Sequence, residues 1–258
     1  MEVTSYAPGT PNWVDVSSGD LPVTVAFYQA LFGWDAADQG EEAGHYTMFE
    51  IDGKPVAAAG PKMSDDGPPS WTTYISVTDV DATAAAITAN GGTVIVPPMD
   101  VMDVGRMACA FDPGGTFFSV WQPKLHIGAV VVNEPNTWCW NELTCRGADE
   151  LLEFYCAVFG WTIHKNEGQG FVYREIMVDG RSVAGCMEME GDQWPAELPN
   201  HWMSYFAVAD CDATAARAAE LGGTVHVPPF DIPMGRISVL TDPTGAVFSI
   251  IRFAGSAD

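Results

Sequence analysis

Apolar and polar positions along the first half of the chain alternate in short segments, and one longer segment has helical spacing. Asn12–Val16 alternates as a strand with one buried face does. The next segment predicts a helix, with Asp20 suited to cap its start and Gly33 to end it. The apolar stripe of this helix consists of Val23, Phe27, Ala30 and Leu31.

The rest of the first half continues the pattern. The same alternation predicts strands at Tyr46–Ile51, Pro55–Ala59, Trp71–Val77, Thr93–Val96, Arg106–Phe111 and Thr116–Trp121. Asp52-Gly53 is a hairpin turn sequence, and the linker 65–70 is rich in proline, glycine and serine. A second helix is expected to begin at Asp79 or Asp81 and to stop at Gly91-Gly92. The order of elements therefore reads βαβββ twice.

The second half of the chain repeats the first in the same order. Phe27-Tyr28 recurs as Phe154-Tyr155, and Phe32-Gly33-Trp34 as Phe159-Gly160-Trp161. Further pairs of matching blocks are Asp79–Ala84 with Asp210–Ala215, Gly91–Val94 with Gly222–Val225, and Gly105-Arg106 with Gly235-Arg236. Repeats of this length indicate duplicated globular domains rather than a solenoid.

We therefore predict an α+β fold of two tandem modules, residues 1–124 and 125–258. Each module is a pair of βαβββ units that form curved mixed sheets around a cavity, with the helices outside. The join is expected at 124–137, where the strand-like Ile127–Val132 would pack between the modules.

The composition of the chain limits the classes of partner and the cellular compartment that are expected. Eleven basic residues against 34 acidic ones give a formal net charge of −23, which disfavours nucleic acid and anionic membranes as partners. The sequence shows neither a signal-peptide pattern nor an apolar run of membrane-spanning length, so a cytoplasmic protein is expected. The six cysteines lack paired Cys-x-x-Cys spacing and do not follow the repeat, so reduced, packed thiols are expected; a single catalytic cysteine is the alternative.

The layout resembles the vicinal oxygen chelate superfamily, which includes glyoxalase I, extradiol dioxygenases and bleomycin-resistance proteins. The residues that carry the resemblance are the two Phe-Tyr helices, the helix ends Phe32–Trp34 and Phe159–Trp161, the Asp79–Asp81 helix start, and the turns Asp112–Gly115 and Asp242–Gly245. These residues belong to the scaffold, so they speak for the fold more than for the chemistry.

The resemblance also implies metal-ligand positions, which this chain does not fill with ligands. Counting from the helix starts and from the Asp-Pro-x-Gly turns, these positions hold Trp13, Thr72, Ser119, Trp140, Met203 and Ser249. Divalent metals need imidazole, thiolate or carboxylate ligands. No metal site is therefore expected. His201 lies two places from a ligand position, and either a structural or a functional role is open.

Strand alternation names the side chains that would face the cavities. We expect the ligand-binding residues to be Trp13, Tyr74, Ser119, Trp121, Trp140, Met203, Tyr205 and Ser249. Such a surface suits a flat, largely apolar molecule, with stacking on indole rings and a few orienting polar groups. The alternative is that the tryptophans simply fill the sheets and leave no cavity.

Four carboxylates on the same faces are the catalytic candidates: Asp15, Glu50, Glu142 and Glu175. An unpaired carboxylate on an apolar face is costly, and its raised pKa suits proton transfer near neutrality. Arg106 and Arg236 are candidate ion-pair partners, although a structural role is the alternative.

We therefore expect a metal-independent protein that binds a small hydrophobic, aromatic secondary metabolite for sequestration or tailoring. A cofactor-free enzyme of hydroxylase, isomerase or cyclase type is the first alternative, and a metal-dependent lyase or dioxygenase with atypical ligands is the second. No nucleotide, flavin or other cofactor motif is found. No nucleic-acid or membrane partner is expected, and the chain should be a monomer or a weak homodimer.

Overall fold

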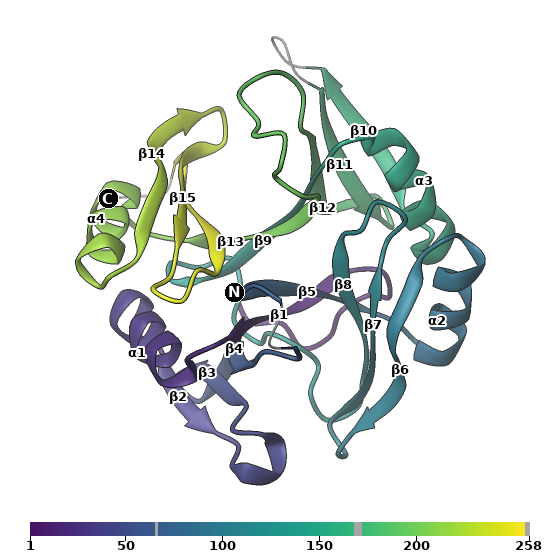
Figure 1. Ribbon diagram of the computed structural model, residues 1–258, viewed down its shortest axis with the longest axis horizontal. Helices are drawn as coiled ribbons and strands as arrows, with labels where there is room; N and C mark the ends of the chain where they lie inside the picture. The colour runs from purple at the N-terminus through teal and green to yellow at the C-terminus, as the bar shows by residue number, and fades with distance from the viewer. Residues whose placement is uncertain (65–66, 168–171, 256–258) are drawn as a thin grey trace.

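The computed structural model describes residues 1–258 except 65–66, 168–171 and 256–258. It contains two eight-stranded mixed sheets and four α-helices (Figure 1), which confirms the α+β fold of two tandem modules. Each sheet curves into an incomplete barrel, and we call the concave faces of the two sheets the first and the second barrel.

The first module contains β1 (Pro11–Ser18), α1 (Leu21–Phe32), β2 (Asp35–Asp38), η1 (Glu41–Ala43), β3 (Thr47–Ile51), β4 (Lys54–Pro61), β5 (Ser70–Ser76), α2 (Val80–Ala89), β6 (Thr93–Val101), β7 (Gly105–Phe111) and β8 (Phe117–Pro123). Its strand order is β2-β3-β4-β1-β5-β8-β7-β6. The two βαβββ units meet where β1 pairs antiparallel with β5, while β1–β4 and β5–β8 are parallel pairs.

The second module contains β9 (Thr137–Cys145), α3 (Ala148–Phe159), β10 (Thr162–Glu167), β11 (Val172–Val178), β12 (Arg181–Glu188), β13 (His201–Ala207), α4 (Cys211–Glu220), β14 (Thr224–Ile232), β15 (Gly235–Thr241) and β16 (Val247–Phe253). Its order, β10-β11-β12-β9-β13-β16-β15-β14, repeats that of the first sheet. The repeat in sequence is therefore a repeat in topology.

The helix boundaries follow the capping chemistry that the sequence predicted. The Asp20 side chain accepts a hydrogen bond from the Val23 amide at 3.2 Å, and Gly33 ends α1 with a left-handed φ of 75°. Asp79, rather than Asp81, caps α2 by accepting from Ala82. Helix α3 begins differently, because Gly147 has no capping side chain and its amide donates instead to Glu188 Oε1.

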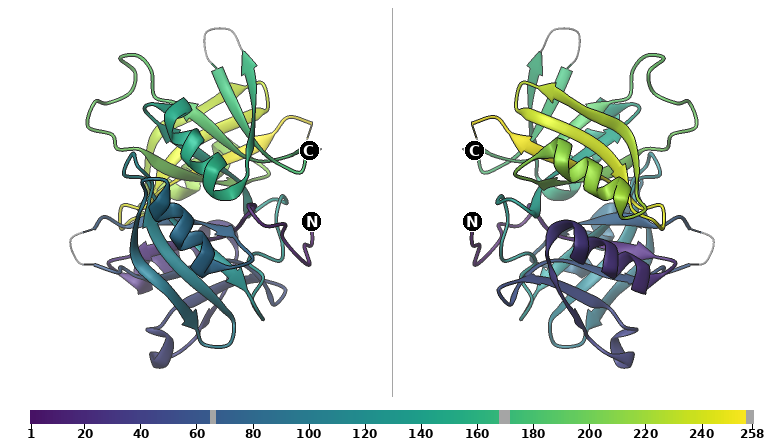
Figure 2. Two further views of the ribbon diagram at one scale, coloured as in Figure 1. Left: turned by 90° about the vertical axis from the view of Figure 1, so that its right-hand side faces the viewer. Right: turned by 90° about the vertical axis from the view of Figure 1, so that its left-hand side faces the viewer.

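The helices lie on the convex faces of the sheets, and they contribute to the contact between the modules together with the central strands β5 and β13, which also pack against each other. Helix α1 packs against α4, and α2 against α3 (Figure 2). Two hydrophobic clusters form there, and each contains residues from both modules. In one cluster Phe27 meets Phe248 with ring centroids 6.3 Å apart, and in the other Phe118 meets Tyr155 at 5.5 Å. The prediction of helices outside is thus right for each sheet, and the helices also pack in pairs across the boundary between the modules.

The repeated scaffold motifs hold the two modules together. Tyr155 of the second Phe-Tyr pair donates to Asp112 Oδ2 of the first Asp-Pro-x-Gly turn at 3.0 Å. In the reciprocal pair Tyr28 faces Asp242, whose charge contributes, after burial, to raising the tyrosine pKa. The helix-end Trp161 donates to the carbonyl of Gly9. These motifs therefore stabilise the contact between modules.

Two local predictions were incomplete or wrong. The sequence located only two of the three strands that follow α1, because β2 is the four-residue segment Asp35–Asp38 and carries no apolar alternation. The segment Ile127–Val132 is not a strand; it forms only an isolated bridge between Glu2 and Val131. Its Ala129, Val131 and Val132 are nevertheless buried in the core cluster that contains Trp13 and Phe206.

Three further expectations concern loops, cysteines and membranes. Asp65 and Asp66 of the expected linker lie outside the described residues. All six cysteines are free thiols, as expected. Among the described residues, none of the helices has the length and apolar character needed to cross a membrane.

Candidate functional site: a duplicated carboxylate–tyrosine network

A hydrogen-bonded network lies in the first barrel around Asp15 on β1. Tyr74 on β5 and Tyr46, just before β3, donate to the same oxygen, Asp15 Oδ2, at 2.8 and 2.9 Å. Trp13 Nε1 in turn donates to the Tyr46 hydroxyl at 3.0 Å. The strand register explains the meeting, because Trp13 lies opposite Tyr74 and Asp15 opposite Thr72.

The second barrel contains the same network with a longer acid. Tyr205 on β13 donates to Glu142 Oε1 at 3.0 Å, and Trp140 Nε1 donates to the Tyr173 hydroxyl at 3.0 Å. Tyr173 also hydrogen-bonds to Glu142 and helps to hold its pKa down against burial. We call the two sets Trp13–Asp15–Tyr46–Tyr74 and Trp140–Glu142–Tyr173–Tyr205 the carboxylate–tyrosine networks.

Burial changes the acidity of both carboxylates. It raises the pKa of Asp15 to about 6, although hydrogen bonds from Tyr74, Tyr46 and Thr72 oppose the shift. Burial also raises the pKa of Glu142, again against hydrogen bonds from tyrosines. The side chains of Asp15 and Glu142 are nearly inaccessible, at 8% and 9% exposure. Each network therefore contains a carboxyl group that keeps its proton to higher pH than an exposed carboxyl does.

The predicted ligand-binding residues surround the networks. Ser119 lies opposite Tyr74 in the parallel β5–β8 pair, and Ser249 opposite Tyr205 in β13–β16. Met203 lies opposite Glu142 at the position that Thr72 holds beside Asp15. The structure thus brings Trp13, Tyr74, Trp140, Met203, Tyr205 and both serines to the two carboxylates, as the alternation predicted.

The four catalytic candidates separate into two kinds. Asp15 and Glu142 occupy corresponding positions and both have tyrosine partners. Glu175 instead accepts from Asn166 Nδ2 at 2.7 Å and lies 3.8 Å from His164 Nδ1. Glu50 is partly exposed and lies opposite Asp35. A catalytic role of Glu50 and Glu175 remains a prediction, and neither belongs to a network.

The sequence reasoning missed Tyr46 and Tyr173, which complete the networks. Tyr46 immediately precedes β3 and Tyr173 is the second residue of β11, and only the carboxylates further along the same strand faces, Glu50 and Glu175, were singled out. A signal was nevertheless present, because the two tyrosines stand at matching places in the repeat, like Asp15 and Glu142. His126, which lies in the first barrel against Trp13, was also missed.

The residues present do not fit the metal ion that the resemblance implies. The six family positions hold indole, hydroxyl and thioether side chains. The nearby Asp15 Oδ2 is already engaged by two tyrosine hydroxyls. Within the described ranges, no three or more His, Cys, Asp or Glu side chains are grouped so that they could hold a metal ion.

The structure gives partners to the two arginines and to His201. Arg106 pairs with Asp81 and Asp100, and Arg236 with Asp212 and Asp231. The arginines are therefore not the partners of the interior carboxylates, because they lie on the outside of β7 and β15 and reach the helix starts. His201 Nδ1 hydrogen-bonds to the carbonyl of Pro199, which agrees with a structural role.

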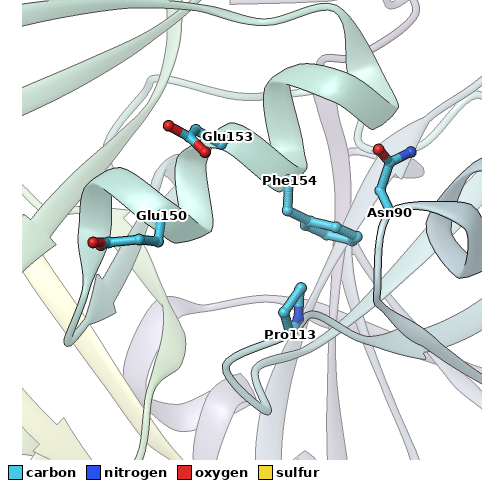
Figure 3. A pocket seen from close by; sticks show the side chains of 5 residues that line it. All are labelled: Asn90, Pro113, Glu150, Glu153 and Phe154. Atoms are coloured by element: carbon cyan, nitrogen blue, oxygen red, sulfur yellow. The ribbon is translucent and has the colours of Figure 1, made fainter.

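Two hollows on the surface of the described residues lie away from the networks. One, of about 360 Å³, is lined by Asn90, Pro113, Glu150, Glu153 and Phe154 between α2 and α3 (Figure 3). Another, of about 350 Å³, lies beside α3 and β10. Both are open, shallow surfaces next to helices, and neither contains a predicted site residue. The expected cavities inside the sheets thus remain a prediction, and the first barrel is filled largely by aromatic side chains.

Comparisons with known proteins show relatives along the whole chain. "Putative glyoxylase CFP32" of Mycobacterium tuberculosis (strain CDC 1551 / Oshkosh) is 44% identical over 258 residues, covering 96% of this chain and 97% of the relative. "Anthracycline biosynthesis protein DnrV" of Streptomyces peucetius is 39% identical over 267 residues, covering 97% and 95%.

Solved structures share the fold at low identity. The Mn(II)-bound glyoxalase from Novosphingobium aromaticivorans superposes with a TM-score of 0.66 at 18% identity, covering 95% of this chain and 84% of that one. The 2,3-dioxygenase LapB from Pseudomonas sp. KL28 has a TM-score of 0.66 at 13% identity, covering 96% and 93%. The family model matches residues 10–120 and again 136–250. The chain therefore belongs to the Glyoxalase/Bleomycin resistance protein/Dioxygenase superfamily, with one copy of the family's module in each half.

Proposed function

We propose that this chain binds a planar, oxygenated aromatic metabolite inside a barrel, for sequestration or tailoring, without a metal ion at the family's positions. The observation that carries the proposal is the duplicated carboxylate–tyrosine network, which lies among the residues at those positions. At those positions, hydroxyl groups, a thioether and indole rings stand where metal-binding members of the family have metal-ligating side chains.

The chemistry of the networks suits such a ligand. Indole faces and methionine side chains provide apolar, polarisable contacts for a flat ring system. Tyrosine hydroxyls and a carboxyl group with a raised pKa can exchange hydrogen bonds with a phenol or quinone oxygen. The relatives named for anthracycline biosynthesis support this class, because anthracyclines are oxygenated polycyclic aromatics.

Titration with 1,8-dihydroxyanthraquinone tests binding, followed by tryptophan fluorescence quenching and calorimetry. We expect saturable binding that is unchanged by exhaustive dialysis against EDTA, and elemental analysis showing no stoichiometric metal. Glu142→Gln and Tyr205→Phe, or their first-barrel counterparts Asp15→Asn and Tyr74→Phe, should weaken binding, depending on which barrel is used.

A matched control comes from the hollow between α2 and α3. Glu153→Gln changes the same functional group on the helix surface and should leave binding unchanged. Binding that Glu153→Gln abolishes, or that needs added Mn²⁺ or Fe²⁺, would contradict the proposal. The second of these results would favour a metal-dependent lyase or dioxygenase with atypical ligands.

A second candidate function is cofactor-free proton transfer, which the raised carboxyl pKa values favour. The carboxylate would remove a proton from a carbon next to a ligand carbonyl, and a tyrosine hydroxyl would hydrogen-bond to the enolate oxygen. Deuterium exchange at the α-carbon of an aromatic ketone such as 1-tetralone, followed by NMR, measures this step. Exchange that Glu142→Gln or Asp15→Asn removes while binding persists supports an enzyme, and binding without exchange supports sequestration.

A further inference from the structure

The two barrels share their networks but differ in what fills them. In the first barrel the His126 ring lies edge-on against Trp13, with centroids 4.5 Å apart and an interplanar angle of 88°. The Trp121 ring is 5.7 Å from the same imidazole, and Trp121 Nε1 donates to the His126 carbonyl at 2.8 Å. We call Trp121 and His126 the aromatic plug.

The plug is held by specific backbone contacts. Asn12 Nδ2 donates to the Ile127 carbonyl at 2.8 Å, and the His126 amide donates to Val104 at 3.0 Å. Gly105 lies directly beneath the indole, since a Cβ there would lie 2.2 Å from Trp121 Cζ2. The lack of a side chain at Gly105 thus leaves space for the Trp121 ring, and two hydrogen bonds fix the segment that carries His126.

The second barrel lacks the Trp121 half of this arrangement. Ile251 stands at the place of Trp121, opposite Ile237 as Trp121 is opposite Met107. By position in the repeat His126 corresponds to Ser256, which carries no ring and lies outside the described residues. The plug is therefore not duplicated in sequence.

Three interior side chains of the second barrel are more exposed than their counterparts in the first, although Ile251 and Trp121 are equally buried at 6%. Trp13 is 4% exposed and Cys109 is fully buried, whereas their counterparts Trp140 and Val239 are partly exposed. Tyr205 is also partly exposed, while Tyr74 is classed with the buried residues. These side chains face the barrel interior, so the difference concerns the interior itself.

We propose that the aromatic plug closes the first barrel and that the second barrel takes the aromatic ligand against Trp140. The first barrel shows how the ligand would lie, because there a ring of the chain itself is held against the corresponding Trp13. The inference rests on the proposed function for its ligand class. It adds that the second barrel is the binding site and that the presence or absence of the aromatic plug determines which barrel binds.

The lining of the second barrel restricts the ligand further. The network carboxylate Glu142 accepts hydrogen bonds from Tyr205 and Tyr173, and both basic groups considered as partners pair elsewhere. A neutral ligand with a hydroxyl or carbonyl oxygen at its edge fits such a site, because it can exchange hydrogen bonds with the carboxyl group and the tyrosine hydroxyls. The apolar part would contact Trp140, Met203 and Ile251.

Exchanging the residues that differ tests this inference. With 1,8-dihydroxyanthraquinone in calorimetry, the wild-type protein should bind one equivalent. Ile251→Trp introduces the indole of the first barrel and should lower the affinity at least tenfold. The double variant Trp121→Ile/His126→Ser removes the plug and should raise the stoichiometry from one to two.

Controls separate binding from folding. Val23→Trp adds the same indole at an exposed position of α1, outside both barrels, and should retain the wild-type affinity. Circular dichroism with thermal unfolding checks each variant. If Ile251→Trp does not fold, Ile251→Phe provides the same obstruction with a smaller ring. Wild-type binding that Ile251→Trp or Ile251→Phe leaves unchanged overturns this inference but not the proposed function. Absence of wild-type binding overturns both.

Discussion

The two barrels carry the same network in different surroundings, and the comparison separates what duplication preserved from what diverged. Trp13, Asp15, Tyr46 and Tyr74 have counterparts with the same chemistry in Trp140, Glu142, Tyr173 and Tyr205. The wall positions Trp121 and Cys109 do not, since Ile251 and Val239 replace them. The polar network is thus common to both barrels, while bulk at a few lining positions decides how far the interior is filled.

The largest effect should come from titrating the interior carboxylates. A pKa raised from 3.8 to about 6 means that folded Asp15 keeps its proton to higher pH than the unfolded chain does. Its contribution to stability is present at low pH and falls by up to about 3 kcal/mol as pH rises through this window. The difference in urea unfolding free energy between wild type and Asp15→Asn should fall accordingly between pH 4 and 7.

The pH dependence of the unfolding free energy can also be compared between the two barrels. Glu142→Gln should show a difference of the same sign, because burial raises the pKa of Glu142 too. In the first barrel burial lowers the pKa of His126 from 6.5 to about 4, so its contribution rises with pH and offsets a fall of similar size from Asp15. His126→Ser should therefore steepen the first barrel's profile. A wild-type minus Asp15→Asn difference that grows with pH would contradict this account.

Adding one methyl group at Gly185 should produce the next largest effect. A Cβ there would lie 1.9 Å from the Tyr173 hydroxyl oxygen and 3.0 Å from Trp140 Nε1. Gly185→Ala should lower the unfolding free energy by about 2 kcal/mol and displace Tyr173 from the second network. Gly60→Ala is the matched control, because its nearest atom is Tyr46 Cδ2 at 3.0 Å. Equal losses in chemical denaturation would show that Gly185 has no special role.

Removing the corresponding tyrosine hydroxyl from either module should weaken the contact between the modules by a similar amount. Tyr155→Phe removes a hydroxyl that donates to Asp112 and accepts from Trp202, each at 3.0 Å. We expect a loss of about 1.5 kcal/mol in unfolding free energy, and a similar loss for Tyr28→Phe, whose hydroxyl accepts from Trp71. Both variants should retain a single unfolding transition. Two separated transitions in the wild-type protein would show that the modules fold independently.

The smallest effect is expected at the duplicated arginines. Arg106→Ala and Arg236→Ala remove ion pairs to carboxylates that are at least half exposed. Solvent screens such pairs, so the melting temperature should change little and the change should shrink further in 1 M NaCl. A large loss of melting temperature that does not depend on salt would instead indicate that the arginines interact with the buried carboxylates.

Much of the fold could be predicted because its signals are local. Asp20, Gly33 and Asp79 mark helix ends through capping bonds within a few residues. Alternation around Trp13 and Trp140 identified the two carboxylates on the inner faces. The strand β2 escaped because Asp35–Asp38 pairs at a sheet edge without an apolar pattern. The segment Ile127–Val132 looked like a strand because its apolar residues are buried, although they pack in a loop.

The sequence by itself determined the duplicated modules, the faces of their strands, and the carboxylates at matching places. Only the tertiary structure decided that Tyr46 and Tyr173 reach those carboxylates, that the helix pairs join the modules, and that His126 fills the first barrel. The physical reason is range. Side-chain alternation is set by the local backbone, whereas contacts between distant segments depend on strand register and sheet curvature.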